Sequence, residues 1–296
     1  MEINLEWYRV FSEAAKTGSL TGAAERLHIT QPAVSHTLKQ LETALGAALF
    51  FRTAKGVRLT AEGEALFGCV QQALGMVEAG ERTVADMRQL TRGEVHIGAS
   101  DTLCKHFLLP YLEKFHRDYP EIRIHVTNRT TPETIALLKE GAIDFGIVNL
   151  PAADPKVDFR GSASIRDILV GRPDDDAVAQ APLALEQLAS YPLLMLEPGG
   201  STRRFLDDFA LRRGIRLRPE FELGSIDLLA QFASSGLGLA FVPRQYVEAE
   251  LRDGRLVEIA LDPPLPERRV GIATLRGVPL STAAKRLLEL LPQPLD

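Results

Sequence analysis

The sequence predicts an α/β fold behind a small N-terminal unit that is rich in α-helix. Three observations support this prediction. Apolar stripes at helical spacing occupy the first 45 residues, one uninterrupted helical pattern covers residues 60–90, and strands alternate with helices from residue 93 onward. With 296 residues, 45% of them hydrophobic, the chain is long enough for about two domains with sizeable cores.

Two helices are expected within the first 27 residues. The first covers residues 5–15, ends at Gly18 and buries one apolar stripe: Trp7, Val10, Phe11 and Ala14. Ser19 is placed to cap the second helix, whose buried face is Leu20, Ala23, Ala24 and Leu27. The paired alanines of that face allow a neighbouring helix to approach closely.

A third helix should follow Thr30, which can cap it, and Pro32 is tolerated in its first turn. Its inward stripe is Val34, Leu38, Leu41 and Leu45. The opposite face carries side chains that can reach base edges and phosphates in a major groove: Gln31, Ser35, His36 and Lys39. The connection over residues 28–30 has the length of a helix-turn-helix turn, so this helix is interpreted as a recognition helix for double-stranded DNA.

Residues 49–59 predict two short strands around a turn at Lys55-Gly56, which together form a wing. Residues 28–60 contain the single carboxylate of Glu42 and four cations: Lys39, Arg52, Lys55 and Arg58. The whole chain has a formal net charge of -5, but phosphate contacts need only local cations. An alternative remains open, because the polar side of the third helix is also typical of a merely solvated face.

Residues 60–90 form a single helical pattern about 45 Å long. Apolar residues follow an alternating four-three spacing, interrupted only at Gly80: Leu66, Val70, Ala73, Val77, Val84 and Met87. Such a seam favours pairing with a second copy of the chain. The alternative is a helix that packs onto its own domain. Cys69 lies beside the seam and is expected to be a small buried residue.

From residue 93 the pattern indicates two lobes. The first is expected to be a parallel sheet, with strands at 95–99, 122–127 and 143–149 and helices at 103–119 and 134–140. Strands at 168–171, 193–196, 221–223 and 239–242, with helices at 203–213 and 226–235, indicate the second lobe. A strand at 269–274 and a helix at 282–291 are interpreted as a return to the first lobe.

The first 65 residues resemble the LysR-type transcriptional regulators. The resemblance is carried by an ordered set of segments: Phe11–Ala15, Gly18–Leu27, Gln31–Ser35, Leu41-Glu42, Leu45-Gly46, Leu49-Phe50, Arg52 and Leu59–Gly63. The chain departs from the family at His36, where arginine is frequent, and at Phe51, where polar residues are frequent.

The resemblance implies a winged helix-turn-helix at residues 1–60 and a linker or dimerisation helix at 61–92. It also implies a two-lobed, periplasmic-binding-protein-like effector domain at 93–296. Lobe I would comprise residues 93–161 and 267–296, and lobe II residues 162–266. Such regulators bind a small inducer between the lobes and assemble as dimers or tetramers.

Polar residues follow the predicted strands and precede the predicted helices, where ligands bind in open α/β sheets. The candidate ligand-binding residues are Ser100, Thr102, Asn128, Arg129, Thr130, Asn149, Ser201, Thr202 and Ser225. Helix N-termini favour anions, and Arg129 is the one obvious cation of the set. We therefore expect a small carboxylate neutralised by Arg129. The alternatives are that the hydroxyl and amide residues are N-caps and that Arg129 points to solvent or to a neighbouring subunit.

Other classes of protein are disfavoured. No run approaches about 18 apolar residues, and residues 1–6 lack the pattern of a signal peptide, so a cytoplasmic protein without a membrane partner is expected. Two cysteines cannot build a disulfide framework, and oxidation of Cys104 would lack a nearby resolving thiol. His96 and His125 are expected to be a structural cross-strand pair and not metal ligands. Neither a phosphate loop nor a Gly-x-Ser-x-Gly elbow occurs, so we expect no enzyme and no cofactor.

The favoured function is a ligand-responsive transcription factor that binds a two-fold symmetric promoter site. The alternative is a small-molecule-binding or enzymatic α/β protein whose N-terminal helices mediate association. For the favoured function, Gln31, Ser35 and His36 are predicted to read bases, with Pro32 in the same helix turn. The predicted contacts to phosphates or the flanking minor groove are Lys39, Arg52, Lys55 and Arg58.

Overall fold

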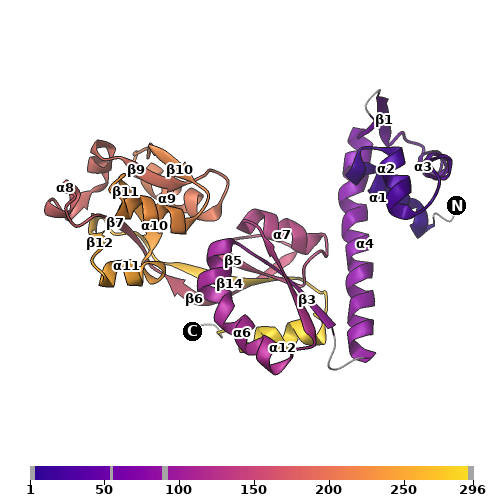
Figure 1. The fold of residues 1–296 in the computed structure, drawn as a ribbon. Coiled ribbons are helices and arrows are strands. Elements are labelled where there is room, and N and C mark those ends of the chain that lie inside the picture. The colour runs from indigo at the N-terminus through magenta and orange to yellow at the C-terminus, as the bar shows by residue number, and fades with distance from the viewer. Residues whose placement is uncertain (1–3, 54–55, 89–92, 293–296) are drawn as a thin grey trace. The chain divides into compact units, whose positions relative to one another are not determined.

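The computed structural model describes residues 4–53, 56–88 and 93–292. The chain forms two compact units, residues 1–81 and residues 82–296, and each is described by itself. Figure 1 labels most of the larger helices and strands. No helix among the described residues is both long and apolar enough to span a membrane.

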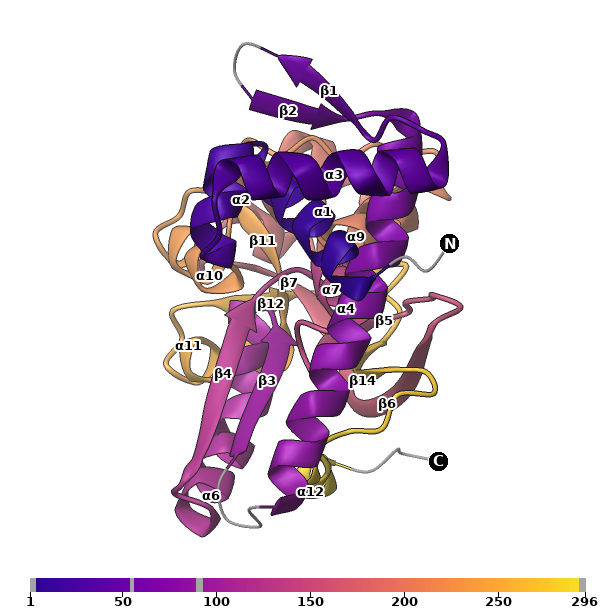
Figure 2. The same cartoon turned by 90° about the vertical axis from the view of Figure 1, so that its right-hand side faces the viewer.

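The N-terminal unit is a winged helix-turn-helix (Figure 2). Its elements are α1 (Leu5–Thr17), α2 (Leu20–Leu27), α3 (Gln31–Leu45), β1 (Phe50–Thr53), β2 (Gly56–Leu59) and the first turns of α4 (Ala61–Arg88). The predicted caps are confirmed, since Ser19 accepts from the amide of Gly22 and Thr30 from that of Ala33. The prediction that Leu45 faces inward is wrong: it is 39% exposed because α3 ends there, beyond the core that Leu38 and Leu41 reach.

The wing is anchored to the end of α1. The amide of Val57 donates to the carbonyl oxygen of Gly18 at 2.9 Å. Gly56 has φ +132°, and a Cβ there would lie 2.2 Å from the same oxygen, so the contact requires glycine. The carboxylate of Glu42 accepts from the amides of Leu49 at 2.8 Å and Phe50 at 3.3 Å. The strand that carries Arg52 is thereby tied to the end of α3.

Helix α4 changes character along its length. Leu66, Val70 and Leu74 belong to the core of the N-terminal unit, as the alternative of packing onto its own domain anticipated. Farther along, Val77 is 38% exposed and Val84 is 59% exposed, which leaves part of the predicted seam uncovered in the single chain. The side chain of Met87 lies outside the described residues. The expectation that Cys69 is buried is wrong, because its position on α4 faces away from the core.

Lobe I contains a five-stranded sheet in the order β4-β3-β5-β14-β6. The strands are β3 (Gly93–Ala99), β4 (Ile122–Asn128), β5 (Phe145–Leu150), β6 (Val157–Ile165) and β14 (Arg268–Leu275). Helices α6 (Leu109–Asp118) and α12 (Thr282–Leu290) pack on one face, and α7 (Thr131–Lys139) packs on the other (Figure 1). The three strands predicted to form a parallel sheet, β3, β4 and β5, are parallel, and the complete sheet is mixed because β14 returns from lobe II antiparallel to both β5 and β6.

The segment predicted as one helix over 103–119 is interrupted. It forms α5 (Asp101–Leu103), a π-helix (Cys104–Leu108) and then α6. A π-helix adds a residue to the turn and changes the direction of its side chains, and such bulges are frequent at functional sites. Hydrophobic periodicity did not reveal this turn, because Leu103, Phe107 and Leu108 are still buried.

Lobe II contains a second five-stranded sheet in the order β10-β9-β11-β7-β12. Its strands are β7 (Asp167–Gly171), β9 (Leu193–Leu196), β10 (Phe221–Leu223), β11 (Leu239–Pro243) and β12 (Val257–Ile259). Helices α9 (Ser201–Leu211) and α10 (Ile226–Ser234) cover opposite faces. Smaller elements complete the lobe: α8 (Asp176–Ala179), β8 (Leu183–Ala184), the 3-10 helices Leu185–Ser190 and Arg244–Tyr246, α11 (Glu248–Arg252) and β13 (Leu261–Asp262).

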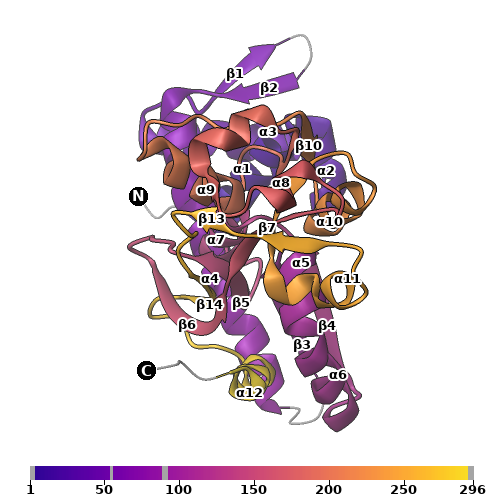
Figure 3. The ribbon, with the colours of Figure 1, turned by 90° about the vertical axis from the view of Figure 1, so that its left-hand side faces the viewer.

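Two connections join the lobes. Strand β6 ends at Ile165 in lobe I and β7 begins at Asp167 in lobe II, while β14 carries the chain back from Arg268 (Figure 3). Strand β6 was not predicted from its sequence, because its exposed and buried positions alternate irregularly. Asp167 and Arg268 therefore lie at the two crossings between the lobes.

Candidate functional site

The outward face of α3 presents polar side chains to solvent. Gln31, Pro32, His36 and Lys39 are exposed, and Ser35 is half-buried. Within the described part of the chain, no hydrogen-bond partner is found for the side chains of Gln31, His36 or Lys39. These groups are therefore free to bind an external partner, while Val34, Leu38 and Leu41 hold the helix from behind.

The wing supplies cations beside this face. Arg52 on β1 donates from its guanidinium to the Ser35 hydroxyl at 3.3 Å, which links the wing to α3 across 17 residues of sequence. Arg58 on β2 is exposed, and Lys55 lies outside the described residues. The predicted base-reading and phosphate-binding positions Ser35 and Arg52 are thus in contact with each other.

A cavity of about 220 Å³ lies between lobes I and II. Seven of the nine predicted ligand residues line it: Ser100, Thr102, Asn128, Thr130, Asn149, Ser201 and Thr202. Several also have the N-cap role that the sequence left open. Ser100 accepts from the amide of Leu103 at 3.3 Å, and Thr130 forms a capping box with Glu133.

Arg129 and Ser225 are not among the residues that line this cavity. Arg129 is exposed, and its guanidinium donates to the carbonyl oxygen of Asn128 at 2.7 Å, so the structure does not place its charge among the residues that line the cavity. Ser225 caps α10 by accepting from the amide of Leu228 at 3.3 Å.

The buried cation of the cleft is Arg268, which the sequence analysis missed. It is 3% exposed, and its Nε and one NH₂ group donate to the Asp167 carboxylate at 2.5 and 2.7 Å. Its other NH₂ group donates to Asn149 at 3.2 Å and to Thr202 at 3.3 Å. Because Asn149 belongs to lobe I and Thr202 to lobe II, this one guanidinium joins both walls of the cleft. The sequence signal that could have identified Arg268 is its position at the start of the strand that returns to lobe I.

Helix N-termini from both lobes face the same cavity. Thr131 opens α7 in lobe I and accepts from the amide of Asn149 at 3.1 Å. Ser201 opens α9 in lobe II, and its hydroxyl donates to the Thr131 hydroxyl at 3.2 Å. The N-terminus of a helix carries partial positive charge and free amides, so this meeting point favours an anion. Thr131 was missed because threonine beside proline is an ordinary helix start.

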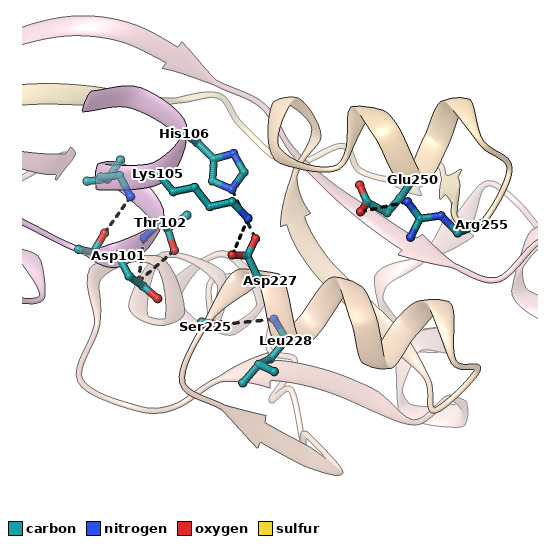
Figure 4. A network of polar contacts seen from close by, with 11 residues as sticks. Asp101, Thr102, Lys105, His106, Ser225, Asp227, Leu228, Glu250 and Arg255 are labelled. Carbon is teal, nitrogen blue, oxygen red and sulfur yellow. Dashed lines mark hydrogen bonds and ion pairs between the residues drawn. The ribbon is translucent and has the colours of Figure 1, made fainter. Parts of the chain in front are cut away.

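A second set of contacts closes the cleft near α10 (Figure 4). Lys105 and His106, from the π-helix of lobe I, both approach Asp227 of lobe II, at 2.8 and 3.4 Å. The His106 ring also stacks on Tyr246, with ring centroids 4.1 Å apart. We call these four residues the interlobe latch. The latch joins the cavity wall of lobe II to the irregular turn of lobe I.

The protonation of the latch follows from its surroundings. Burial lowers the pKa of His106 below its ordinary value, although the hydrogen bond to Asp227 acts in the opposite direction. Burial acts to raise the pKa of Asp227, but contacts with Lys105 and His106 outweigh it, so this pKa is lowered. Burial raises the pKa of Tyr246 to about 12. Asp227 is therefore the anion of the latch at neutral pH.

Cys104 lies one residue before the latch and is half-buried. Burial and the nearby Asp101 carboxylate raise the pKa of its thiol, which disfavours the thiolate that oxidation requires. The other cysteine, Cys69, lies in the N-terminal unit.

Comparison with known families and proteins accounts for nearly the whole chain. Residues 5–64 match the model of the bacterial regulatory helix-turn-helix protein, lysR family, and residues 88–295 match that of the LysR substrate binding domain. The RuBisCO operon transcriptional regulator of Allochromatium vinosum is 30% identical over 96% of this chain and 94% of its own length. The regulator CbbR of Rhodospirillum rubrum is 27% identical, over 97% of this chain and 95% of its own.

Among solved structures, a full-length OxyR variant from Pseudomonas aeruginosa matches with a TM-score of 0.69. It is 24% identical to this chain and covers 98% of it, and the match includes 93% of the OxyR chain. Similarity at this level of identity concerns the fold, and it extends through both units.

Proposed function

The chain belongs to the LysR family of transcriptional regulators, and on this basis we propose that it binds a two-fold symmetric promoter site and responds to a small anionic inducer held between lobes I and II. Regulators of this family bind DNA, respond to small effectors and form oligomers; they are not enzymes. The alternative of an enzymatic α/β protein is thereby set aside. The proposal concerns what this chain recognises and how.

The observation that carries the inducer proposal is the meeting of helix N-termini around Arg268 in the cleft. A carboxylate can accept from the free amides at the start of α9 and from the Thr131 amide at the start of α7, where Pro132 has no N–H and Thr130 caps Glu133. It can also accept from the NH₂ group that Arg268 now directs to Asn149 and Thr202. The positive charge comes from Arg268 in this proposal, replacing the role expected of Arg129.

The cleft also limits how much negative charge the inducer carries. Two carboxylates, Asp101 and Glu197, are among the lining residues, and the charge of Arg268 is already balanced by Asp167. A ligand with several negative charges would meet like charges at close range. We therefore expect a monocarboxylate with hydroxyl or amino groups that donate to Asp101 or Glu197.

For the DNA site, we retain the division of roles on α3 and the wing. Gln31, Ser35 and His36 would contact bases, and Pro32 would set the first turn of the helix. The cations of the helix and wing would contact the DNA phosphates or the flanking minor groove: Lys39, Arg52, Lys55 and Arg58. In this proposal, residues 1–60 bind DNA, 61–92 pair the copies and 93–296 bind the inducer. Inducer binding changes half-site spacing only if it favours one arrangement of the oligomer over another.

Calorimetric titration of the full chain with a panel of small monocarboxylates and dicarboxylates tests the inducer site. Thr202→Val removes a cavity-wall hydroxyl that can donate to the carboxylate once the ligand takes over the Arg268 NH₂ group, and it should weaken the best monocarboxylate about tenfold, the effect of one lost hydrogen bond to a charged group. Arg129→Ala is the matched control and should bind as the wild type does. Equal weakening by Arg129→Ala, or stronger binding of dicarboxylates, would overturn the assignment.

Selection of fragmented genomic DNA tests the DNA site. The wild-type protein should recover a few fragments that share a two-fold symmetric sequence, and Arg52→Ala should recover far fewer of them at raised salt. Recovery of the same unspecific background by both proteins would contradict a specific promoter site.

A further inference from the structure

Three potential metal ligands lie together on the sheet of lobe I, away from the cleft. Glu94 and His96 are on β3, and His125 is on the neighbouring edge strand β4. The parallel register places His96 directly opposite His125, and their rings stack with centroids 4.6 Å apart and planes 8° apart. The expected cross-strand pair is therefore confirmed. We call the three residues the His-Glu cluster.

The donor atoms of the cluster have nearly the separation that a tetrahedral ion requires. One carboxylate oxygen of Glu94 lies 3.5 Å from Nε2 of His96 and 3.7 Å from Nε2 of His125. All three donor atoms lie within 4.8 Å of one another. Zn²⁺ binds such atoms at about 2.0–2.2 Å, which places two ligands of a tetrahedral ion roughly 3.3–3.4 Å apart. Tilting the two rings toward each other closes the remaining gap, and this torsion is soft.

The cluster is accessible and chemically selective. The side chains of His96 and His125 are 26% and 49% exposed, so an ion and its bound water can enter from solvent. Arg123 approaches the other carboxylate oxygen of Glu94 at 3.6 Å and leaves the shared oxygen available. Two imidazoles with one carboxylate suit Zn²⁺ and related transition-metal ions better than Mg²⁺ or Ca²⁺, which prefer oxygen ligands only.

We propose that Glu94, His96 and His125 bind a divalent transition-metal ion, with Zn²⁺ as the best match and water at the fourth position. The ion would cross-link edge strand β4 to β3. The same two strands end beside Ser100 and Asn128, which line the inducer cleft. The proposal stands on the geometry of the cluster and does not depend on the identity of the inducer.

The test is a titration of metal-free full-length protein with ZnCl₂ in competition with a chromophoric chelator. The wild type should bind one Zn²⁺ per chain, and both His96→Asn and His125→Asn should weaken this binding at least about tenfold. His116→Asn is the matched control, because His116 is exposed on α6 outside the cluster, and it should leave binding unchanged. Equal binding by wild type and both cluster variants would overturn the proposal, because the Zn²⁺ would then lie elsewhere.

Two further variants keep the result interpretable. Glu94→Gln preserves shape and should weaken Zn²⁺ binding without altering thermal unfolding of the metal-free protein. Arg123→Gln removes the cation that competes for Glu94 and should strengthen binding. Zn²⁺ should raise the unfolding temperature of the wild type and not that of Glu94→Gln, because only a ligand bound to the native state stabilises it. Weaker binding by Arg123→Gln would contradict a role for Glu94.

Discussion

The outward face of α3 and the cleft between lobes I and II are both polar, but they differ in whether their side chains already have hydrogen-bond partners within the protein. On α3, Gln31, His36 and Lys39 point to solvent without partners among the described residues. In the cleft, Arg268 is already bonded to Asp167, Asn149 and Thr202. The first surface can bind a partner by replacing water alone. The second must exchange internal hydrogen bonds for those of a ligand.

This difference bears on which region can act as a switch. A surface whose polar groups have no internal partners breaks no internal hydrogen bond when it binds, and its affinity is set by charge and shape. A cleft whose two walls are joined by Arg268 and by the interlobe latch has contacts that ligand binding can break and replace. Differential binding to open and closed arrangements is the physical requirement for a response. We therefore propose the cleft as the switch and the outward face of α3 as the surface that reads DNA.

The largest expected effect is the loss of stability caused by replacing Arg268. Arg268→Ala leaves the Asp167 carboxylate buried and unpaired, which should destabilise the fold by about 3–5 kcal/mol. The double variant Arg268→Met with Asp167→Leu should recover much of this loss, because no buried charge remains. Urea unfolding of the full chain measures both. A double variant that is less stable than Arg268→Ala would contradict the prediction that the unpaired carboxylate of Asp167 causes the loss.

The next largest expected effect concerns the contact between Gly56 of the wing and the carbonyl oxygen of Gly18. Gly56→Ala places a Cβ 2.2 Å from the Gly18 carbonyl oxygen at φ +132°, a strained position for alanine. We expect a loss of about 1–3 kcal/mol in stability of the N-terminal unit and weaker DNA binding. The matched control is Gly68→Ala, since a Cβ at Gly68 meets nothing within 4 Å. Similar unfolding curves for both variants would show that the wing is not anchored at Gly18.

On the face of α3, Ser35 and Arg52 should separate sequence reading from affinity. Ser35→Ala should change base preference at one position by about 1–3 kcal/mol. Arg52→Ala should weaken all sequences similarly and reduce the salt slope of binding by about one. Binding to a randomised DNA pool at two salt concentrations measures both effects. The two side chains are in contact with each other, and identical sequence profiles for the two variants would contradict the division of roles.

The smallest expected effect is the pH response of the interlobe latch. Burial lowers the pKa of His106, with Lys105 acting in the same direction and Asp227 and Glu250 opposing it, so protonation favours the unfolded chain. The stabilisation that neutral His106 provides is present above its ordinary pKa of 6.5 and is lost as pH falls through the lowered value.

His106→Phe retains ring stacking on Tyr246 and should lose less stability than the wild type between about pH 7.5 and about pH 5.5. Urea unfolding at the two pH values measures the difference. His116→Phe is the control for removing an exposed histidine. A wild type no more acid-sensitive than His106→Phe would exclude His106 as the responsible group.

The three helices and the wing of the N-terminal unit could be predicted because their determinants are local. Ser19 and Thr30 cap helices through bonds that span three residues, and Gly18 ends α1 through its own left-handed conformation. Most strands and helices of the lobes were predicted for the same reason. Strand β6 and the π-helix were not, because their hydrogen bonds depend on neighbours that the local pattern does not contain.

The residues of the cleft also separate into those that local sequence predicts and those that it does not. The sequence by itself determined that polar residues such as Ser100, Asn149 and Thr202 follow strands or open helices, because hydrophobic periodicity marks where each element ends. Only the tertiary structure decided which cation joins them. Arg129 adjoins them in sequence but does not line the cavity, whereas Arg268, which does, lies 101 residues from Asp167 and 119 from Asn149. Such a pairing depends on how the returning strand crosses between the lobes, and local sequence does not encode it.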